Sequence, residues 1–272
     1  MLRHPALWGW GLATALILAV VAAAPVLSRH DPNRMNIALA LSRPSRVYWL
    51  GTDEAGRDVL SRVLHGGRES ITAALAVIAA AIVIGVLVGA TAGWFRGAID
   101  EALMRVTDLF FAFPPLVLAM AIAAALGPSL ENAVIAAIVV WWPTYARLVR
   151  AEVLRVRENL YVEAARALGL SDGRLVLRHV LPQTWGVVNA RATVDIGYTI
   201  LFIATLGFVG LGSKPPAAEW GAMIASARTY FLDYWWTMAY PGLAIFVTVI
   251  CVSLLGDALN DVVGLRGVER RG

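Results

Sequence analysis

The side chains that most often perform chemistry are sparse and scattered in this chain. It has four histidines, and no two of them have the one-turn spacing of a zinc-binding helix: His4, His30, His65 and His179. The single cysteine, Cys251, can form neither an intrachain disulfide nor a cysteine cluster for a metal. We therefore expect no catalytic residue, no metal site and no cofactor bound by the chain itself.

A glycine-rich stretch at residues 207–214 comes close to a phosphate-binding loop. It reads GFVGLGSK, but Ser213 stands between Gly212 and Lys214. Pro215 then removes a backbone donor where an anion-binding helix would begin. ATP binding by this mechanism is excluded, so any ATP-driven work requires a partner.

The elements that would position polar residues are long and apolar. Of the 272 residues, 59% are hydrophobic and 15% are charged, whereas soluble domains average about 45–50% and about 25%. So few charges cannot cover a soluble globule of this size. The chain is therefore predicted to be an all-α integral membrane protein, and its net charge of +4 is too small to indicate nucleic acid as a partner.

Six charge-free runs are candidate membrane spans, because a bilayer core needs roughly 20 helical residues. The runs are 5–28, 70–95, 109–130, 132–146, 196–213 and 234–256. The fourth is short, but Arg147 and Arg150 can extend their stems to the interface. The first also resembles a signal peptide, yet it is longer than the usual apolar region of about 7–15 residues. We expect six transmembrane helices.

These runs divide the chain into an N-terminal transmembrane helix at 1–28, an extracytoplasmic segment at 29–69, a five-helix core at 70–259 and a cytoplasmic tail at 260–272. The core includes a long cytoplasmic loop at 147–185. With the N-terminus inside, thirteen basic residues lie on the inner side and nine on the outer side. This excess predicts that both termini are cytoplasmic.

Two patterns within the runs suggest contacts or gates. Gly85, Gly89, Gly93 and Gly97 follow each other at four-residue spacing, which leaves a smooth helix face for close approach of another helix. This face could form a gate, a subunit interface or an ordinary intrachain contact. The prolines Pro114 and Pro115 predict that their helix bends or begins anew there, which is found both in pore-lining helices and in helices without that role.

One charged pair lies near the start of the fifth run. Arg191 and Asp195 are four residues apart, so they share a helix face and can pair. Charged groups at membrane depth usually face a cavity or the protein interior. The pair could line a translocation path, or it could be structural with Arg191 at the cytoplasmic interface.

The loop at 147–185 predicts a short helix around 161–168, with Gly169 ending it and Ser171 positioned to cap the next helix. Such a helix could dock into a groove of a partner, or it could lie on lipid headgroups.

In this loop Glu163, Ala164 and Ala165 are followed by Gly169 and then by residues 179–182, which read HVLP. This sequence resembles the EAA loop of ABC importer permeases. The family pattern is EAA, three residues, G, nine residues, I, one residue, LP. The chain keeps Pro182 and departs from the pattern at His179. Importers of peptides and nickel often have histidine at that position of the pattern.

Three further stretches resemble the second permease of dipeptide, oligopeptide and nickel importers. They are residues 49–62, which read WLGTDEAGRDVLSR, residues 108–115, and a group near the end of the chain at 208–212, 219–221 and 256–259. The resemblance extends over 31–259 and implies a type I permease fold similar to that of the methionine importer permease.

The resemblance implies partners and a location. They are a homologous second permease, two ATPase subunits that bind ATP, a substrate-binding protein on the outer face and the lipid of a bacterial or archaeal cytoplasmic membrane. The residues that it assigns to coupling are Glu163, Ala164, Ala165, Gly169, His179 and Pro182. Peptide is the expected cargo, with nickel and glutathione-like solutes as alternatives.

Two other classes of protein are alternatives to an importer permease. A stand-alone secondary transporter would need internal repeats and more ionisable residues at mid-membrane, and an intramembrane enzyme would need a nucleophile and a base.

Overall fold

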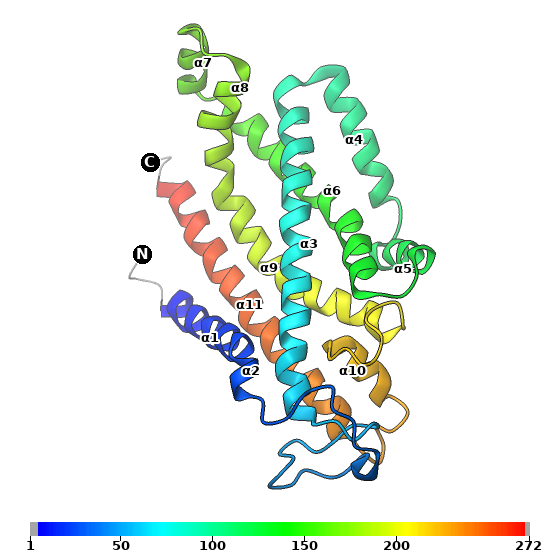
Figure 1. The fold of residues 1–272 in the computed structure, drawn as a ribbon. Helices are drawn as coiled ribbons and strands as arrows, with labels where there is room; N and C mark the ends of the chain where they lie inside the picture. The colour runs from blue at the N-terminus through cyan, green and yellow to red at the C-terminus, as the bar shows by residue number, and fades with distance from the viewer. Residues whose placement is uncertain (1–4, 270–272) are drawn as a thin grey trace.

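The described part of the protein is a bundle of long helices without a β-strand (Figure 1). The structure is a computed structural model that describes the backbone of residues 5–269 and the side chains of residues 5–262. Its helices are α1 (Pro5–Ala22), α2 (Ala24–Leu27), the 3-10 turn η1 (Ile37–Leu39), α3 (Val59–Phe95), α4 (Gly97–Phe111), α5 (Pro115–Leu126), α6 (Leu130–Arg157), α7 (Leu160–Ala167), α8 (Asp172–Leu175), a π-helical turn η2 (Val176–Val180), α9 (Leu181–Phe208), α10 (Trp220–Ala227) and α11 (Trp236–Glu269).

The central helix α3 is longer than the charge-free run that predicted it. The run begins at residue 70, but the helix begins at Val59 because the side chain of Asp58 accepts a hydrogen bond from the Ser61 amide at 3.0 Å. With 37 residues it extends about 55 Å, well beyond the apolar thickness of a bilayer. Its first turns therefore belong to the folded region that precedes the membrane.

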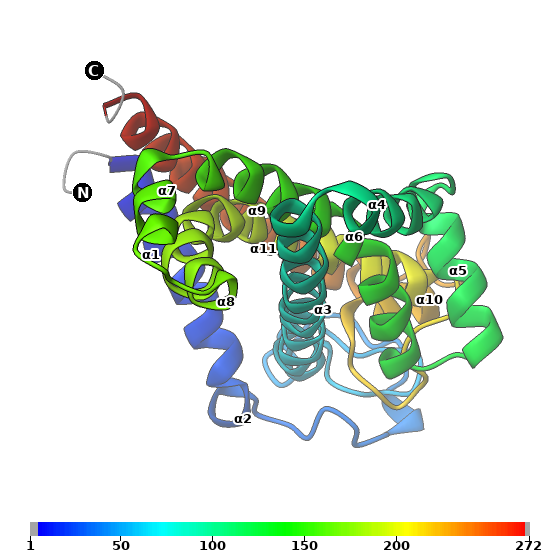
Figure 2. The same cartoon turned by 90° about the horizontal axis from the view of Figure 1, so that it is seen from above.

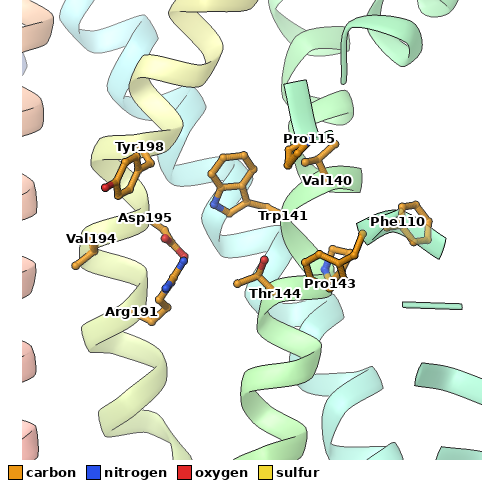
Figure 3. Close-up of a pocket in the computed structure, with 11 residues that line it drawn as sticks. Phe110, Pro115, Val140, Trp141, Pro143, Thr144, Arg191, Val194, Asp195 and Tyr198 are labelled. Atoms are coloured by element: carbon orange, nitrogen blue, oxygen red, sulfur yellow. The ribbon is translucent and has the colours of Figure 1, made fainter. Parts of the chain in front are cut away.

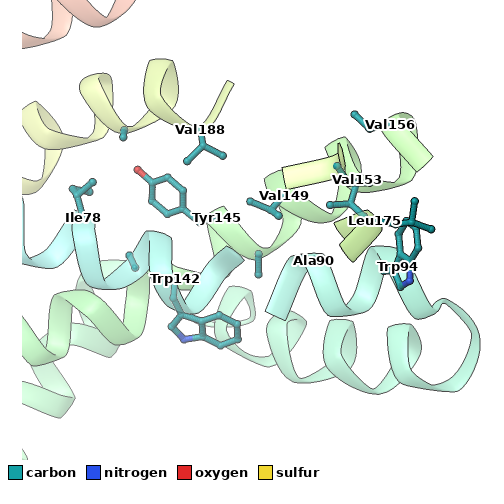
Figure 4. Close-up of a cluster of buried hydrophobic side chains, with 14 of the residues drawn as sticks. Ile78, Ala90, Trp94, Trp142, Tyr145, Val149, Val153, Val156, Leu175 and Val188 are labelled. Carbon is teal, nitrogen blue, oxygen red and sulfur yellow. The ribbon is translucent and has the colours of Figure 1, made fainter. Parts of the chain in front are cut away.

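Helix α6 packs along α3 and forms the centre of the largest buried cluster (Figure 4). Tyr145, Val149 and Val153 of α6 are fully buried in it, and Trp94 closes it at the end of α3. The cluster continues into α7 and α8, so the short helices between α6 and α9 share a core with the long helices.

The predicted run at 109–130 is not a single helix. It contains the last residues of α4 and the whole of α5. Helix α4 ends at Phe111, and α5 begins at Pro115 with its axis turned by 86°. Pro114 and Pro115 lie at this break, because proline lacks the amide needed to continue the helix and fits the first helical position. The chain therefore begins a new helix at Pro115, almost at a right angle to α4.

The other long helices lie on the opposite side of the central helix α3 from α4 and α5 (Figures 1 and 2). Helix α9 packs between α6 and α11, and α1 lies on the outside against α11, with only Thr14 and Val21 of α1 buried. In the described residues five helices are long and apolar enough to cross a membrane, or six if the bent pair α4 and α5 is one span.

Candidate functional site

The short helix α7 lies at one end of the bundle, between α6 and α9 (Figure 1). It ends in a Schellman motif: the amide of Gly169 donates to the carbonyl of Arg166 at 2.9 Å, and the amide of Leu170 donates to the carbonyl of Ala165 at 3.3 Å. Gly169 has a φ of +86°, which a residue with a Cβ rarely adopts. Glycine therefore turns the chain from α7 toward α8.

One face of α7 is buried and the other is exposed. Val162 lies in the core cluster, and Ala165 packs against it. Leu160 and Leu168 are each 82% exposed, while Glu163 and Ala164 also lie on the exposed side. Large apolar side chains at a protein surface mark interaction sites when they are held together on one element. Helix α7 thus presents a rigid, partly apolar surface.

Residues of the predicted loop motif beyond α7 lie on the adjoining elements. His179 belongs to η2, and its carbonyl accepts a hydrogen bond from the Tyr161 hydroxyl at 3.3 Å. Pro182 lies in the first turn of α9, directly after η2, and α8, η2 and α9 continue as one helix over Asp172–Phe208. The missing proline amide thus removes one helical hydrogen bond next to the π-helical turn. Ser171 precedes α8, but its side chain makes no capping hydrogen bond. The motif therefore extends from α7 across α8 and η2 into the first turn of α9.

The glycine row of α3 faces α6. A Cβ at Gly85 would clash with the Cβ of Tyr145, and a Cβ at Gly93 would lie 3.0 Å from the side chain of Val153. Gly89 is equally close to the backbone of α6. Gly97 is not part of this row, because α3 ends at Phe95 and Gly97 begins α4. In this structure Gly85, Gly89 and Gly93 form an intrachain helix contact.

Helix α4 is bound to α6 by ion pairs. Arg150 donates to both carboxylate oxygens of Asp100, at 2.5 and 2.6 Å, and Arg147 donates to Asp108 at 2.7 Å. The Arg147 guanidinium also lies 3.9 Å above the ring of Phe111. These contacts fix the end of α4 directly before the break at Pro114 and Pro115.

A cavity of about 460 Å³ lies between α6, α9 and the break that separates α4 from α5 (Figure 3). Its wall includes the charged pair that the sequence predicts: Arg191 Nε lies 3.0 Å from Asp195 Oδ2. Tyr145 donates a hydrogen bond to the same Asp195 oxygen at 3.0 Å. Figure 3 shows the pair on α9 facing Trp141 and Thr144 of α6.

Sequence reasoning missed a buried ion network at the opposite end of the bundle. Asp53, Arg57 and Arg62 are nearly inaccessible to solvent, and Asp53 lies 2.7 Å from Arg57 and 3.2 Å from Arg62. Arg62 also donates to the carbonyl of Ala217 at 2.8 Å, and the Trp236 indole donates to the carbonyl of Thr52. The alternation of opposite charges at 53–62 was the available signal.

Comparisons with known proteins agree with this architecture. Residues 81–266 match the family described as "Binding-protein-dependent transport system inner membrane component". The chain is 46% identical over 247 residues to a probable D,D-dipeptide transport system permease of Escherichia coli, covering 91% of this chain and 83% of the relative. It is 36% identical over 257 residues to a nickel transport system permease of the same organism, covering 93% of each.

A solved structure shows the same fold. A chain of the MetNI methionine ABC transporter, solved in inward-facing conformations, has a TM-score of 0.62 at 19% identity and covers 75% of this chain and 97% of that chain. The helical architecture and the family match define a permease subunit of an ABC importer. The chain belongs to the family of binding-protein-dependent transport system inner membrane components. The predicted all-α, type I permease fold is confirmed.

Proposed function

We propose that this chain forms half of a translocation path for di- or oligopeptides, together with a homologous second permease. The identity to the D,D-dipeptide permease, 46%, is higher than the 36% identity to the nickel permease. The cavity between α6 and α9 supports the proposal because it combines aromatic walls with one charged pair. Nickel and glutathione-like solutes are the alternatives within the same family.

We further propose that one of two ATPase subunits docks on α7 of this chain and that these two partners bind and hydrolyse the ATP. One observation carries this proposal: α7 is fixed by the buried Val162 while Leu160 and Leu168 point outward at 82% exposure. An apolar surface on a rigid element can enter a groove of a partner. Movement of the groove would then be transmitted to α6 and α9 through the shared core.

This docking implies an orientation. The end with α7 would lie in the cytoplasm together with both termini, and the segment 29–58 would lie outside, where a substrate-binding protein could dock. The outer end has several exposed apolar side chains that support such a contact: Trp49, Phe231, Leu232 and Trp235. The same aromatic residues could instead anchor this end in the lipid headgroups.

Affinity purification in mild detergent tests the ATPase contact. The chain would be expressed with its transport partners, and copurified subunits would be identified by mass spectrometry. The double variant Leu160→Asp/Leu168→Asp places charges on exposed positions, so the fold should persist while less ATPase copurifies for each second permease retained. Gly169→Asp should act in the same direction, because it strains the left-handed turn at the end of α7.

Two matched variants serve as controls. Leu232→Asp alters a similarly exposed leucine at the opposite end, and Gly97→Asp alters another glycine with positive φ and open surroundings. Both should retain the ATPases. If wild type purified without any nucleotide-binding partner, or if all four variants behaved alike, docking on α7 would be wrong.

Uptake into proteoliposomes that contain the complete importer tests the cargo. Dialanine, nickel and glutathione would be supplied separately with the binding protein and ATP. We expect ATP-dependent uptake of dialanine. Uptake of only nickel or only glutathione would replace the peptide proposal.

A further inference from the structure

The cavity between α6 and α9 holds an arginine whose hydrogen-bonding capacity is only partly used. Arg191 bonds Asp195 through Nε, and its terminal Nη1 and Nη2 groups make no hydrogen bond with any residue that the structure describes. The Arg191 side chain is 51% exposed, whereas the Asp195 side chain is 2% exposed. The cation therefore faces the cavity and the anion lies behind it.

Asp195 is satisfied from within the protein. Its Oδ2 atom accepts hydrogen bonds from Arg191 and from the buried Tyr145 hydroxyl, each at 3.0 Å. This arrangement fixes the Nε side of the guanidinium against the protein wall. The two terminal nitrogens are left with the planar, forked geometry that matches a carboxylate.

The walls around the guanidinium suit a small organic anion. Trp141 and Tyr198 lie on the two facing helices, and Phe110 and Pro115 close the side formed by α4 and α5 (Figure 3). A volume of about 460 Å³ is within the range of small-molecule sites, roughly 300–1,000 Å³. Such walls can pack against short peptide side chains without selecting strongly among them.

We propose that Arg191 binds the terminal carboxylate of the peptide as it passes through this cavity. The inference rests on the proposed function, peptide import, and adds a binding site within the path. Because Asp195 compensates the charge of Arg191, the attraction for an anion is moderate, and a path must release what it binds. The phosphate of an anionic lipid offers similar chemistry, so the test must separate the two sources.

Equilibrium binding of radiolabelled dialanine tests the site. The sample is this chain with its second permease and ATPases in phosphatidylcholine nanodiscs, without binding protein or nucleotide. Dialanine amide lacks the carboxylate and should compete at least about tenfold more weakly than dialanine, the size expected from one charge-assisted hydrogen-bonded contact. This comparison uses wild type alone, so it does not depend on how a variant folds.

Variants then locate the contact. Arg191→Gln should weaken dialanine binding about tenfold or more, and Arg191→Lys should fall between, because lysine keeps the charge but not the fork. Arg105→Gln is the matched control, since Arg105 pairs with Glu101 at the same four-residue spacing but in an exposed position. It should bind dialanine like wild type.

Several outcomes would overturn the site. They are equal competition by dialanine amide, equal binding by Arg191→Gln and Arg105→Gln, or no binding by a wild-type complex that imports dialanine. If Arg191→Gln reduced only the phosphatidylglycerol retained in mixed-lipid nanodiscs, the cavity would belong to a lipid headgroup and the proposal would fail. Each of these results leaves peptide import standing, whereas absence of dialanine uptake by the complete wild-type importer would reject peptide import itself.

Discussion

The guanidinium of Arg166 on α7 lies over the indole of Trp94 at the end of α3, with 5.0 Å between its Cζ atom and the ring centroid. Arg157 of α6 lies over the same ring at 5.4 Å and donates hydrogen bonds to the carbonyls of Gly93 and Trp94. Trp94 is buried, so it joins the short helix α7 to α3 and α6, which pack along each other. A displacement of α7 must move this cluster or break it.

Replacement of Arg166 with alanine should therefore weaken coupling without removing the docking surface. A cation–π contact at an exposed site contributes about 0.5–1 kcal/mol, which corresponds to roughly a two- to fivefold change. We expect ATPase subunits to copurify normally while peptide imported per ATP hydrolysed falls by about that factor. Arg105→Ala removes an exposed arginine elsewhere and should leave the ratio unchanged. If both variants imported the same amount of peptide per ATP hydrolysed, Arg166 would have no role in coupling α7 to the long helices.

The contact between α3 and α6 predicts that alanine substitutions at different glycines change the stability of the chain by very different amounts. A Cβ at Gly89 would clash with the carbonyl oxygen of Ala146 and lie 3.0 Å from the Arg150 amide. Gly89→Ala should thus destabilise the folded chain by about 1–3 kcal/mol through overpacking. Thermal unfolding in detergent would show this as a lower midpoint.

Gly242 is the matched control for this prediction. It also lies within a long helix, but a Cβ there would meet nothing within 4 Å. Gly242→Ala should be neutral or stabilising by up to about 1 kcal/mol, because alanine favours the helix. Equal midpoints for the two variants would show that α3 and α6 are not in close contact.

How much of the fold can be predicted from the sequence depends on how its charges are paired. The charge-free runs located the spans, and Gly169 and Pro115 marked the turn after α7 and the start of α5, because each has a strong backbone preference. The start of α3 was missed, since Arg62, Arg68 and Glu69 lie inside that helix and a charge-free search stops at such residues. A buried, paired arginine and a solvated one look alike in sequence; only the folded partners distinguish them.

Arg62 should therefore be essential for the end of the bundle opposite α7. It lies 3.2 Å from Asp53 and donates to the carbonyls of Pro32 and Ala217, so it joins three segments of the chain. Arg62→Met would leave the carbonyls of Pro32 and Ala217 without this donor and Asp53 with Arg57 alone, and each buried group left unsatisfied costs about 1–3 kcal/mol. Limited proteolysis should then cut the segment 29–58 faster than in wild type. Arg68→Met, at an exposed position of the same helix, should not change the cleavage rate.

Glu219 should make the stability of the end opposite α7 depend on pH. Burial raises the pKa of this carboxyl above its ordinary value of 4.5, although hydrogen bonds from the Gly221 and Ala222 amides and the Ser70 hydroxyl oppose the rise. The folded chain then holds the proton more tightly than the unfolded chain, so the free energy of unfolding decreases as pH rises from 4.5 through the folded pKa. Glu219→Gln has no proton to lose, and its unfolding midpoint should change less than that of wild type between about pH 5 and pH 8. Glu131→Gln, at an exposed carboxyl in the first turn of α6, should keep the wild-type pH profile; identical profiles for all three proteins would show that Glu219 folds with its pKa unchanged.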